Sequence, residues 1–171
     1  MKTALLILLM VSACECTRAQ DNRVRRDRVS APLAAYIRSL TPAGPSLAPR
    51  KAVLVFFLRF VDFGCEVCLN NFLDFCDTLN SSVSRYGFRN IIMVFQRDDN
   101  EEGYQMKTTR KWSRACNLHY PIYLAPSELF EENDIEYSTA MFLNDSDVIE
   151  LSGQVPLPVE VQNEFIEKLF R

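Results

Sequence analysis

The stretch Ala52–Cys68, AVLVFFLRFVDFGCEVC, decides the fold predicted for this chain. Residues 52–61 are apolar except for Arg59, and such a run is typical of a central strand covered on both faces. Residues 62–64 end the run, and a helical pattern follows as far as Gly87. In that pattern, apolar residues recur at spacings of three and four, which places them on one helix face: Cys68, Phe72, Phe75, Cys76, Leu79 and Val83.

The chain on the C-terminal side of this stretch alternates in the same way. Further strands are predicted at 90–96, 120–124, 139–143 and 148–151, the last two joined by a turn at 144–147. Further helices are predicted at 104–117, at 128–132 with Ser127 as its cap, and at 159–170. The order βαβαβαββα predicts one α/β domain over 51–171, a central mixed β-sheet with helices on both faces.

The composition excludes several classes of protein. The chain has 171 residues, of which 48% are hydrophobic and 24% charged, as in an ordinary globular domain and unlike a disordered, collagen-like or long coiled-coil protein. Its net charge of −3 does not suit a protein that coats nucleic acid, so no nucleic-acid partner is expected. Six cysteines are too few for a fold built from disulfides at this length.

The first residues predict export. Lys2 is followed by an apolar run over 4–11 and by Ser12-Ala13-Cys14, which is typical of a signal peptide over 1–13 and too short for a membrane-spanning helix. The residues 11–14 (VSAC) look like a bacterial lipobox, with Cys14 as the lipidated residue; the alternative is an ordinary signal peptide cut after Ala13 or later. We expect a membrane-anchored lipoprotein that faces the periplasm or the cell exterior.

Residues 14–50 read as a tether between this anchor and the domain. The segment contains one short helical stretch near Ala31–Leu40, followed by 41–45 (TPAGP), whose prolines and glycine stop regular structure. Five arginines lie within 18–28 against two acids. These arginines either lie against anionic lipid headgroups or belong to a solvated linker.

The motif Cys65-Glu66-Val67-Cys68 lies where the first buried strand meets its helix. The N-terminus of a helix has unpaired N–H groups and a partial positive charge, both of which favour a thiolate and lower the pKa of a cysteine placed there. The second cysteine, one turn on, is within reach of a mixed disulfide formed by the first. The alternative is a structural disulfide or two unreactive core thiols.

Residues 51–170 resemble the thioredoxin-like superfamily, and within it the membrane-tethered TlpA/ResA-like and redoxin-like thiol–disulfide proteins. Three stretches carry the resemblance: 52–60 with the cysteine motif, 120–127 (YPIYLAPS), and 137–145 (YSTAMFLND). The resemblance implies a thioredoxin-like fold in which Cys65 attacks a disulfide and Cys68 resolves the intermediate. It implies no cofactor beyond the cysteines.

The chain departs from this family pattern around the motif. The family's cis-proline falls at Ser138, which with Thr139 is expected to line the substrate groove. The buried acid that many relatives have six residues before the first cysteine is replaced by Arg59, which either stabilises the thiolate or turns to solvent. The nearest acids, Asp62 and Glu66, are expected to be exposed; with Arg59 they are the candidate modulators of the thiolate.

The other cysteines and the single histidine receive structural interpretations. Cys76 is expected to pack in the core, as is Cys116 unless it pairs with another cysteine, and Cys16 is assigned no role. His119 could join the cysteine pair in a metal site like that of copper-delivery proteins of this fold, but those have a longer cysteine spacing. We expect no metal.

Two functional hypotheses follow. The first is an extracytoplasmic, lipid-anchored thiol–disulfide oxidoreductase, whose partners are protein thiols and disulfides and an external thiol donor. The alternative is a non-catalytic thioredoxin-fold lipoprotein that binds a protein partner near Cys65 and Ser138 without turnover. The redox potential of the cysteine pair and its exchange with other disulfides distinguish the two.

Overall fold

The computed structural model describes residues 28–40, 52–86, 90–98, 102–115 and 120–170. The predictions for the signal peptide, Cys14, Cys16, Cys116 and His119 lie outside these residues. Within the described part of the chain, no helix combines the length and the apolar character that crossing a membrane requires.

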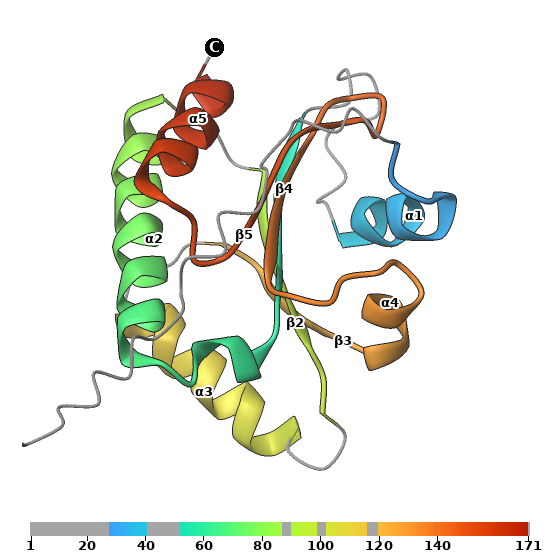
Figure 1. The fold of residues 1–171 in the computed structure, drawn as a ribbon, viewed down its shortest axis with the longest axis vertical. Helices are drawn as coiled ribbons and strands as arrows, with labels where there is room; N and C mark the ends of the chain where they lie inside the picture. The colour runs from blue at the N-terminus through green and yellow to red at the C-terminus, as the bar shows by residue number, and fades with distance from the viewer. Residues whose placement is uncertain (1–27, 41–51, 87–89, 99–101, 116–119, 171) are drawn as a thin grey trace, which may run out of the picture.

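A five-stranded mixed sheet forms the centre of the domain (Figure 1). Its order is β3-β2-β1-β4-β5; β1 pairs in parallel with β2, and β2 with β3, whereas β4 pairs antiparallel with both β1 and β5. The strands span Val53–Leu58 (β1), Ile91–Gln96 (β2), Ile122–Ala125 (β3), Thr139–Leu143 (β4) and Ile149–Gln154 (β5).

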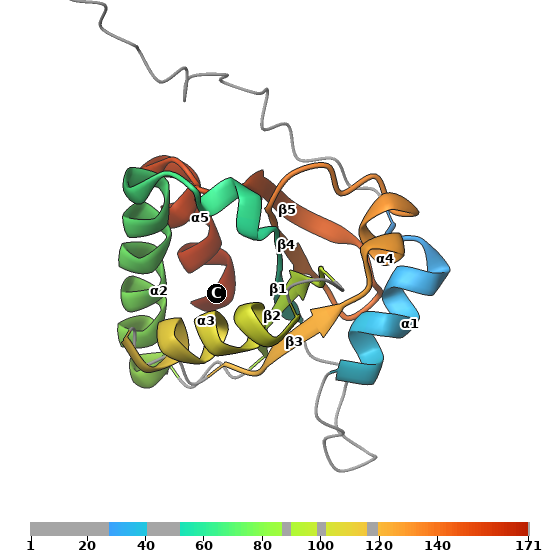
Figure 2. The same ribbon diagram turned by 90° about the horizontal axis from the view of Figure 1, so that it is seen from below.

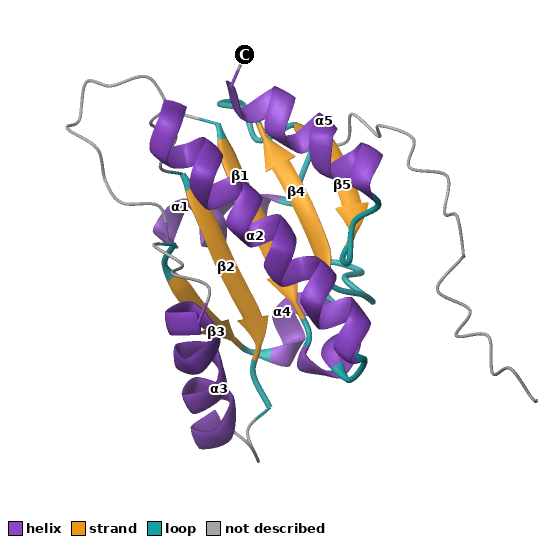
Figure 3. Cartoon of the chain, turned by 90° about the vertical axis from the view of Figure 1, so that its left-hand side faces the viewer, coloured by secondary structure: helices purple, strands orange, loops and turns teal. Residues whose placement is uncertain are grey.

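Helices cover both faces of this sheet, as predicted. In Figure 2, α2, α3 and α5 lie on one side of it and α1 and α4 on the other, and Figure 3 shows α2 and α5 crossing in front of the strands. The helices span Ala31–Leu40 (α1), Glu66–Tyr86 (α2), Glu102–Ala115 (α3), Ser127–Glu131 (α4) and Val159–Phe170 (α5), with a 3₁₀ turn, η1, at Phe60–Phe63.

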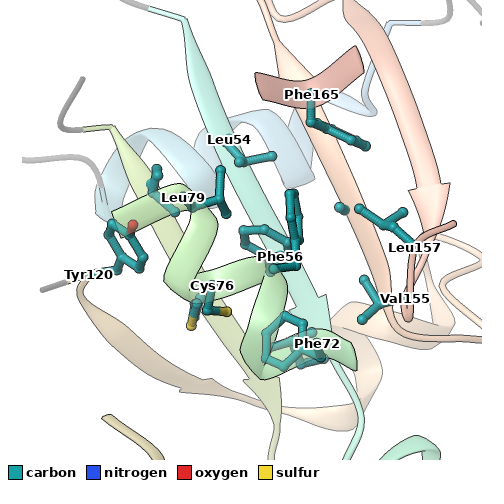
Figure 4. Close-up of a cluster of buried hydrophobic side chains, with 14 of the residues drawn as sticks. Leu54, Phe56, Phe72, Cys76, Leu79, Tyr120, Val155, Leu157 and Phe165 are labelled. Atoms are coloured by element: carbon teal, nitrogen blue, oxygen red, sulfur yellow. The ribbon is translucent and has the colours of Figure 1, made fainter. Parts of the chain in front are cut away.

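Strand β1 divides its side chains between two apolar cores. All six of its residues are buried, and alternate side chains point to opposite faces. Leu54, Phe56 and Leu58 pack in the core under α2 and α5, part of which Figure 4 shows. The residues between them belong to the second core, which α1 and α4 cover. A strand that is apolar on both faces therefore occupies the middle of the sheet, as its sequence predicts.

Helix α1 packs on the domain although it lies within the segment expected to be a tether. Leu33 and Ile37 are buried in the second core, and Tyr123 of β3 donates a hydrogen bond from its hydroxyl to Leu40 O (3.0 Å). An ion pair joins Arg38 to Asp147 in the turn between β4 and β5. Residues 28–40 thus contribute to the hydrophobic core of the folded unit.

Two local predictions need correction. The apolar run does not stay extended to residue 61, because β1 ends at Leu58 and η1 follows. Ser127 is not the cap of α4: Pro126 occupies the N-cap position, and the Ser127 hydroxyl donates instead to Arg97 O (3.0 Å). That hydrogen bond ties the start of α4 to the end of β2, a contact that no local pattern shows.

Candidate functional site

The two cysteines of the motif lie at the junction of η1 and α2, beyond the C-terminal end of β1. The carbonyl of Cys65 accepts a hydrogen bond from the Leu69 amide (3.0 Å), the first bond of α2, which makes Cys65 the N-cap residue. Cys65 is half-buried and Cys68 is buried in the first turn of the helix. Cys65 and Cys68 are not joined to each other by a disulfide bond.

This placement suits thiol chemistry. The side chain of an N-cap residue lies beside the unpaired N–H groups of the first helical turn, where the helix dipole is positive and an anion is stabilised. A thiolate at Cys65 would therefore be favoured and accessible, while Cys68 would remain shielded until its neighbour reacts.

Ser138, at the position where the family has its cis-proline, is fully buried and hydrogen-bonded to the residues before the motif. Its amide and its hydroxyl both donate to Asp62 Oδ2, each at 2.7 Å. The same hydroxyl oxygen accepts a hydrogen bond from the Arg59 amide (2.8 Å). We call Arg59, Asp62 and Ser138 the polar clamp, because together they fasten the loop before β4 to the turn that leads to Cys65.

The Arg59 side chain completes this fastening. Its Nε donates to Gln96 Oε1 at the end of β2 (2.8 Å), and its Nη1 donates to the carbonyl of Glu136. The Ser138 carbonyl in turn accepts a hydrogen bond from the Val155 amide (2.7 Å), next to the cis peptide bond Val155–Pro156. The clamp therefore holds together the ends of β1, β2 and the loop before β4.

The structure revises the expectations for the residues around the motif. Asp62 is half-buried and bonded to Ser138 rather than exposed, whereas Glu66 is exposed as expected. The guanidinium of Arg59, which is half-buried, donates hydrogen bonds to Gln96 and to the carbonyl of Glu136. Thr139 is half-buried, and its hydroxyl donates to Tyr137 O (2.8 Å).

Gln96 and Glu136 were not among the residues that the sequence singled out. They lie 37 and 77 residues from Arg59 along the chain, so no local spacing connects them to the motif. One signal was available: Gln96 is the polar last residue of an otherwise apolar strand. A polar residue there marks the C-terminal end of the strand, where such contacts occur.

Cys76, farther along α2, packs in the core as predicted. It is fully buried and lies in the first core with Phe72, Leu79 and Tyr120 (Figure 4). The Tyr120 hydroxyl is buried without a hydrogen-bond partner among the described residues. Burial, with a smaller contribution from Cys76, raises the pKa of Tyr120 above its ordinary value. No group of three metal-ligating side chains forms within the part of the chain that the structure describes.

Comparison with known proteins establishes the fold. No protein-family model matches the chain, and no curated protein matches it in sequence. Among solved structures, a thioredoxin-like protein in its oxidized form is 11% identical, with 76% of this chain and 85% of that chain covered and a TM-score of 0.54.

Two further solved structures agree. A secreted thiol-disulfide isomerase from Corynebacterium glutamicum is 11% identical over 71% of this chain and 70% of that chain, with a TM-score of 0.51. A thiol:disulfide interchange protein of the thioredoxin family from Chlorobium tepidum TLS is 13% identical over 72% of this chain and 82% of that chain, with a TM-score of 0.50. The chain has the thioredoxin-like fold, as its resemblance to that superfamily predicts.

Proposed function

We propose that this protein is a thiol–disulfide oxidoreductase in which Cys65 and Cys68 exchange with disulfides of other proteins. The observation that carries the proposal is the position of Cys65, a half-buried cysteine at the N-cap of α2, with Cys68 in the first turn of the same helix. The thioredoxin-like fold supports the same conclusion, because solved structures that share it include a secreted thiol-disulfide isomerase.

The exchange takes place in two steps. The Cys65 thiolate attacks one sulfur of a substrate disulfide, forming a mixed disulfide and releasing the other substrate sulfur as a thiolate, which takes up a proton. The Cys68 thiolate then attacks Cys65 Sγ, which releases the second substrate thiol and leaves a Cys65–Cys68 disulfide. Two electrons pass from the pair to the substrate, and an external thiol donor returns the pair to its reduced form.

The test is single-turnover exchange between the reduced full chain and a small disulfide. Cys65→Ser should abolish exchange, and Cys68→Ser should stop the reaction at a mixed disulfide that mass spectrometry detects. The matched control is Cys76→Ser, which removes a thiol of the same helix that is fully buried, and which should leave the exchange rate within about twofold of the wild type. A wild type that does not exchange would overturn the proposal in favour of a partner-binding protein without turnover, and exchange that survives Cys65→Ser would show that Cys65 is not the attacking cysteine.

We further propose that the protein is exported and held on a membrane through lipid on Cys14, facing the periplasm or the cell exterior. The sequence pattern of residues 2–14 supports this. The point where the expected tether joins the domain also supports a membrane anchor: Arg28 forms a β-bridge with Val148, at the end of the sheet opposite Leu58. Since β1 spans about 20 Å, a tether leaving there would direct Cys65 away from the membrane.

Labelling with a radioactive fatty acid in a bacterial host tests the anchor. The wild type should incorporate label and stay with the membrane fraction after washing with high salt. Cys14→Ser should abolish both, while Cys16→Ser, a change of the same kind two residues away, should abolish neither. An unlabelled wild type recovered in the soluble fraction would show an ordinary signal peptide instead.

A further inference from the structure

The surface around Cys65 is unusually apolar for an exposed site. Five large apolar side chains are exposed among the described residues, and three of them surround the motif: Val61, Val67 and Tyr137, with exposed fractions of 73%, 75% and 45%. Val61 lies in η1, and Val67 lies between the two cysteines. Tyr137 is brought to them because its neighbour Ser138 is bonded to Asp62, the neighbour of Val61. We call these three residues the apolar patch.

The same surface carries an excess of negative charge. Glu66 directly precedes Val67 in the first turn of α2, and Glu136 directly precedes Tyr137. Both are exposed, and neither forms an ion pair within the described ranges. With Asp62 they make three acids among the residues next to the patch, against one arginine, Arg59, whose guanidinium is hydrogen-bonded to Gln96 and to the carbonyl of Glu136.

The loop that approaches the site from α4 increases this negative charge. Between residues 128 and 136 five acids are exposed and no lysine or arginine intervenes: Glu128, Glu131, Glu132, Asp134 and Glu136. A concentration of one sign of charge beside a reactive group attracts partners of the opposite sign and raises their association rate.

We propose that this surface selects disulfides carried on protruding polypeptide segments that have an apolar residue next to the cysteine and lysine or arginine beyond it. The inference rests on the proposed exchange function and specifies its substrate. Cys65 is half-buried between η1 and α2, so a disulfide on a protruding segment reaches it more easily than one on a flat surface. The apolar patch takes the residue beside the cysteine, and Glu66 and Glu136 face the basic flanks.

The test compares three disulfide-linked peptide dimers as substrates of the reduced full chain. Their sequences are Lys-Leu-Cys-Leu-Lys, Glu-Leu-Cys-Leu-Glu and Lys-Ser-Cys-Ser-Lys. Each exchange rate is divided by the rate of the same peptide with dithiothreitol, which removes the intrinsic reactivity of the peptide. At low salt the basic apolar peptide should react about tenfold faster than the acidic one, and this ratio should fall towards one in ~1 M salt.

Two sets of variants identify the residues responsible. The double change Glu66→Gln and Glu136→Gln should reduce the basic-to-acidic ratio to about threefold or less. Glu164→Gln, which removes an exposed carboxylate from α5, should leave the ratio unchanged. Because a ratio is compared, any effect of Glu66 on the reactivity of Cys65 itself cancels.

The apolar part is tested in the same way. The double change Val61→Thr and Val67→Thr keeps the side-chain shape and should slow the leucine peptide about threefold to tenfold while leaving the serine peptide unaffected. Val159→Thr, at another exposed valine at the start of α5, should have no effect on either peptide.

The outcomes separate this inference from the function beneath it. If no peptide exchanges, the proposed function fails, and the inference with it. If all peptides exchange at equal normalised rates, or the ratio survives the double glutamate change, the function stands and the inference is wrong. A concentration-dependent dimer in sedimentation velocity that dissolves in the Val61→Thr and Val67→Thr variant would also overturn it, because the patch would then bind a second copy.

Discussion

Cys65 and Cys76 belong to the same helical segment, yet their surroundings differ completely. Cys65 caps the N-terminus of α2, is half-buried, and has the polar clamp and exposed apolar side chains as neighbours. Cys76 lies about three turns further on, fully buried among aromatic and aliphatic side chains. Position along the helix, rather than the presence of a thiol, therefore distinguishes a candidate reactive cysteine from a cysteine that packs in the core.

Removing a large side chain from the hydrophobic core around Cys76 should have the largest effect on stability. Phe72 is fully enclosed and contacts Phe56 and Phe63, with ring centroids 5.8 Å and 5.2 Å away. Phe72→Ala should lower the free energy of unfolding by ~3–5 kcal/mol, because it leaves a cavity where these rings meet. Urea unfolding followed by circular dichroism measures the loss. Val159→Ala, at an exposed position, should stay within about 0.5 kcal/mol of the wild type.

Breaking the polar clamp should come next. Ser138→Ala removes the hydroxyl that donates to Asp62 and accepts from the Arg59 amide, which leaves this half-buried amide without that partner and costs about 1–3 kcal/mol. Ser138→Pro, which introduces the family's usual residue, also removes the amide donor to Asp62 and should cost more than the alanine change.

The control for the clamp is Ser152→Ala in β5, a partly buried serine for which we expect a change of less than about 0.5 kcal/mol. Urea midpoints of the three variants decide the matter. A Ser138→Pro protein as stable as the wild type would show that the hydrogen bonds to Asp62 contribute nothing to the fold.

Two tyrosines provide the smallest and sharpest contrast. The Tyr120 hydroxyl is buried and has no hydrogen-bond partner among the described residues, so Tyr120→Phe should leave stability unchanged or raise it by up to about 1 kcal/mol. The Tyr123 hydroxyl donates to Leu40 O, so Tyr123→Phe should lower stability by about 1 kcal/mol. Changes of opposite sign in the thermal unfolding temperatures of Tyr120→Phe and Tyr123→Phe would support these different roles of the two hydroxyls. Equal losses would contradict them.

The burial of Tyr120 also predicts that the stability of the fold depends on pH. Burial raises the pKa of Tyr120 in the folded state above its ordinary value of 10.0. The unfolded chain therefore loses this proton first, and the stability that the neutral phenol contributes is lost as the pH rises above 10.0. When the pH is raised from neutral to above 10.0, the free energy of unfolding should fall more for the wild type than for Tyr120→Phe. Urea unfolding at each pH measures this difference.

Much of the fold was predictable from local patterns. The sequence shows the continuous apolar runs of β1 and β2, which are typical of strands buried on both faces. It also shows where the apolar spacing changes to three and four residues at the cysteine motif, which is typical of a helix buried on one face. The turn η1 was not predictable in this way, since its residues continue the apolar run. The packing of α1 on the sheet was missed because a tether and a docked amphipathic helix can share the same short pattern.

The candidate site was predictable only in part. The cysteine pair stands out by its spacing and by its place between a strand and a helix. The polar clamp does not, because Asp62 and Ser138 are 76 residues apart and meet only when β4 pairs with β1 in the register that sets Thr139 opposite Phe57. Sequence distance therefore hid the partner of Asp62 and made this carboxylate look exposed.

A redox titration of the full chain, read by thiol trapping and mass spectrometry, tests the central claim most directly. The account predicts one two-electron transition of the Cys65–Cys68 pair between ~−270 and −120 mV, absent in Cys65→Ser and retained in Cys76→Ser. A pair that stays oxidised below about −300 mV, or cysteines that never join, would contradict it. The motif would then be structural, and the protein a binding module rather than an oxidoreductase.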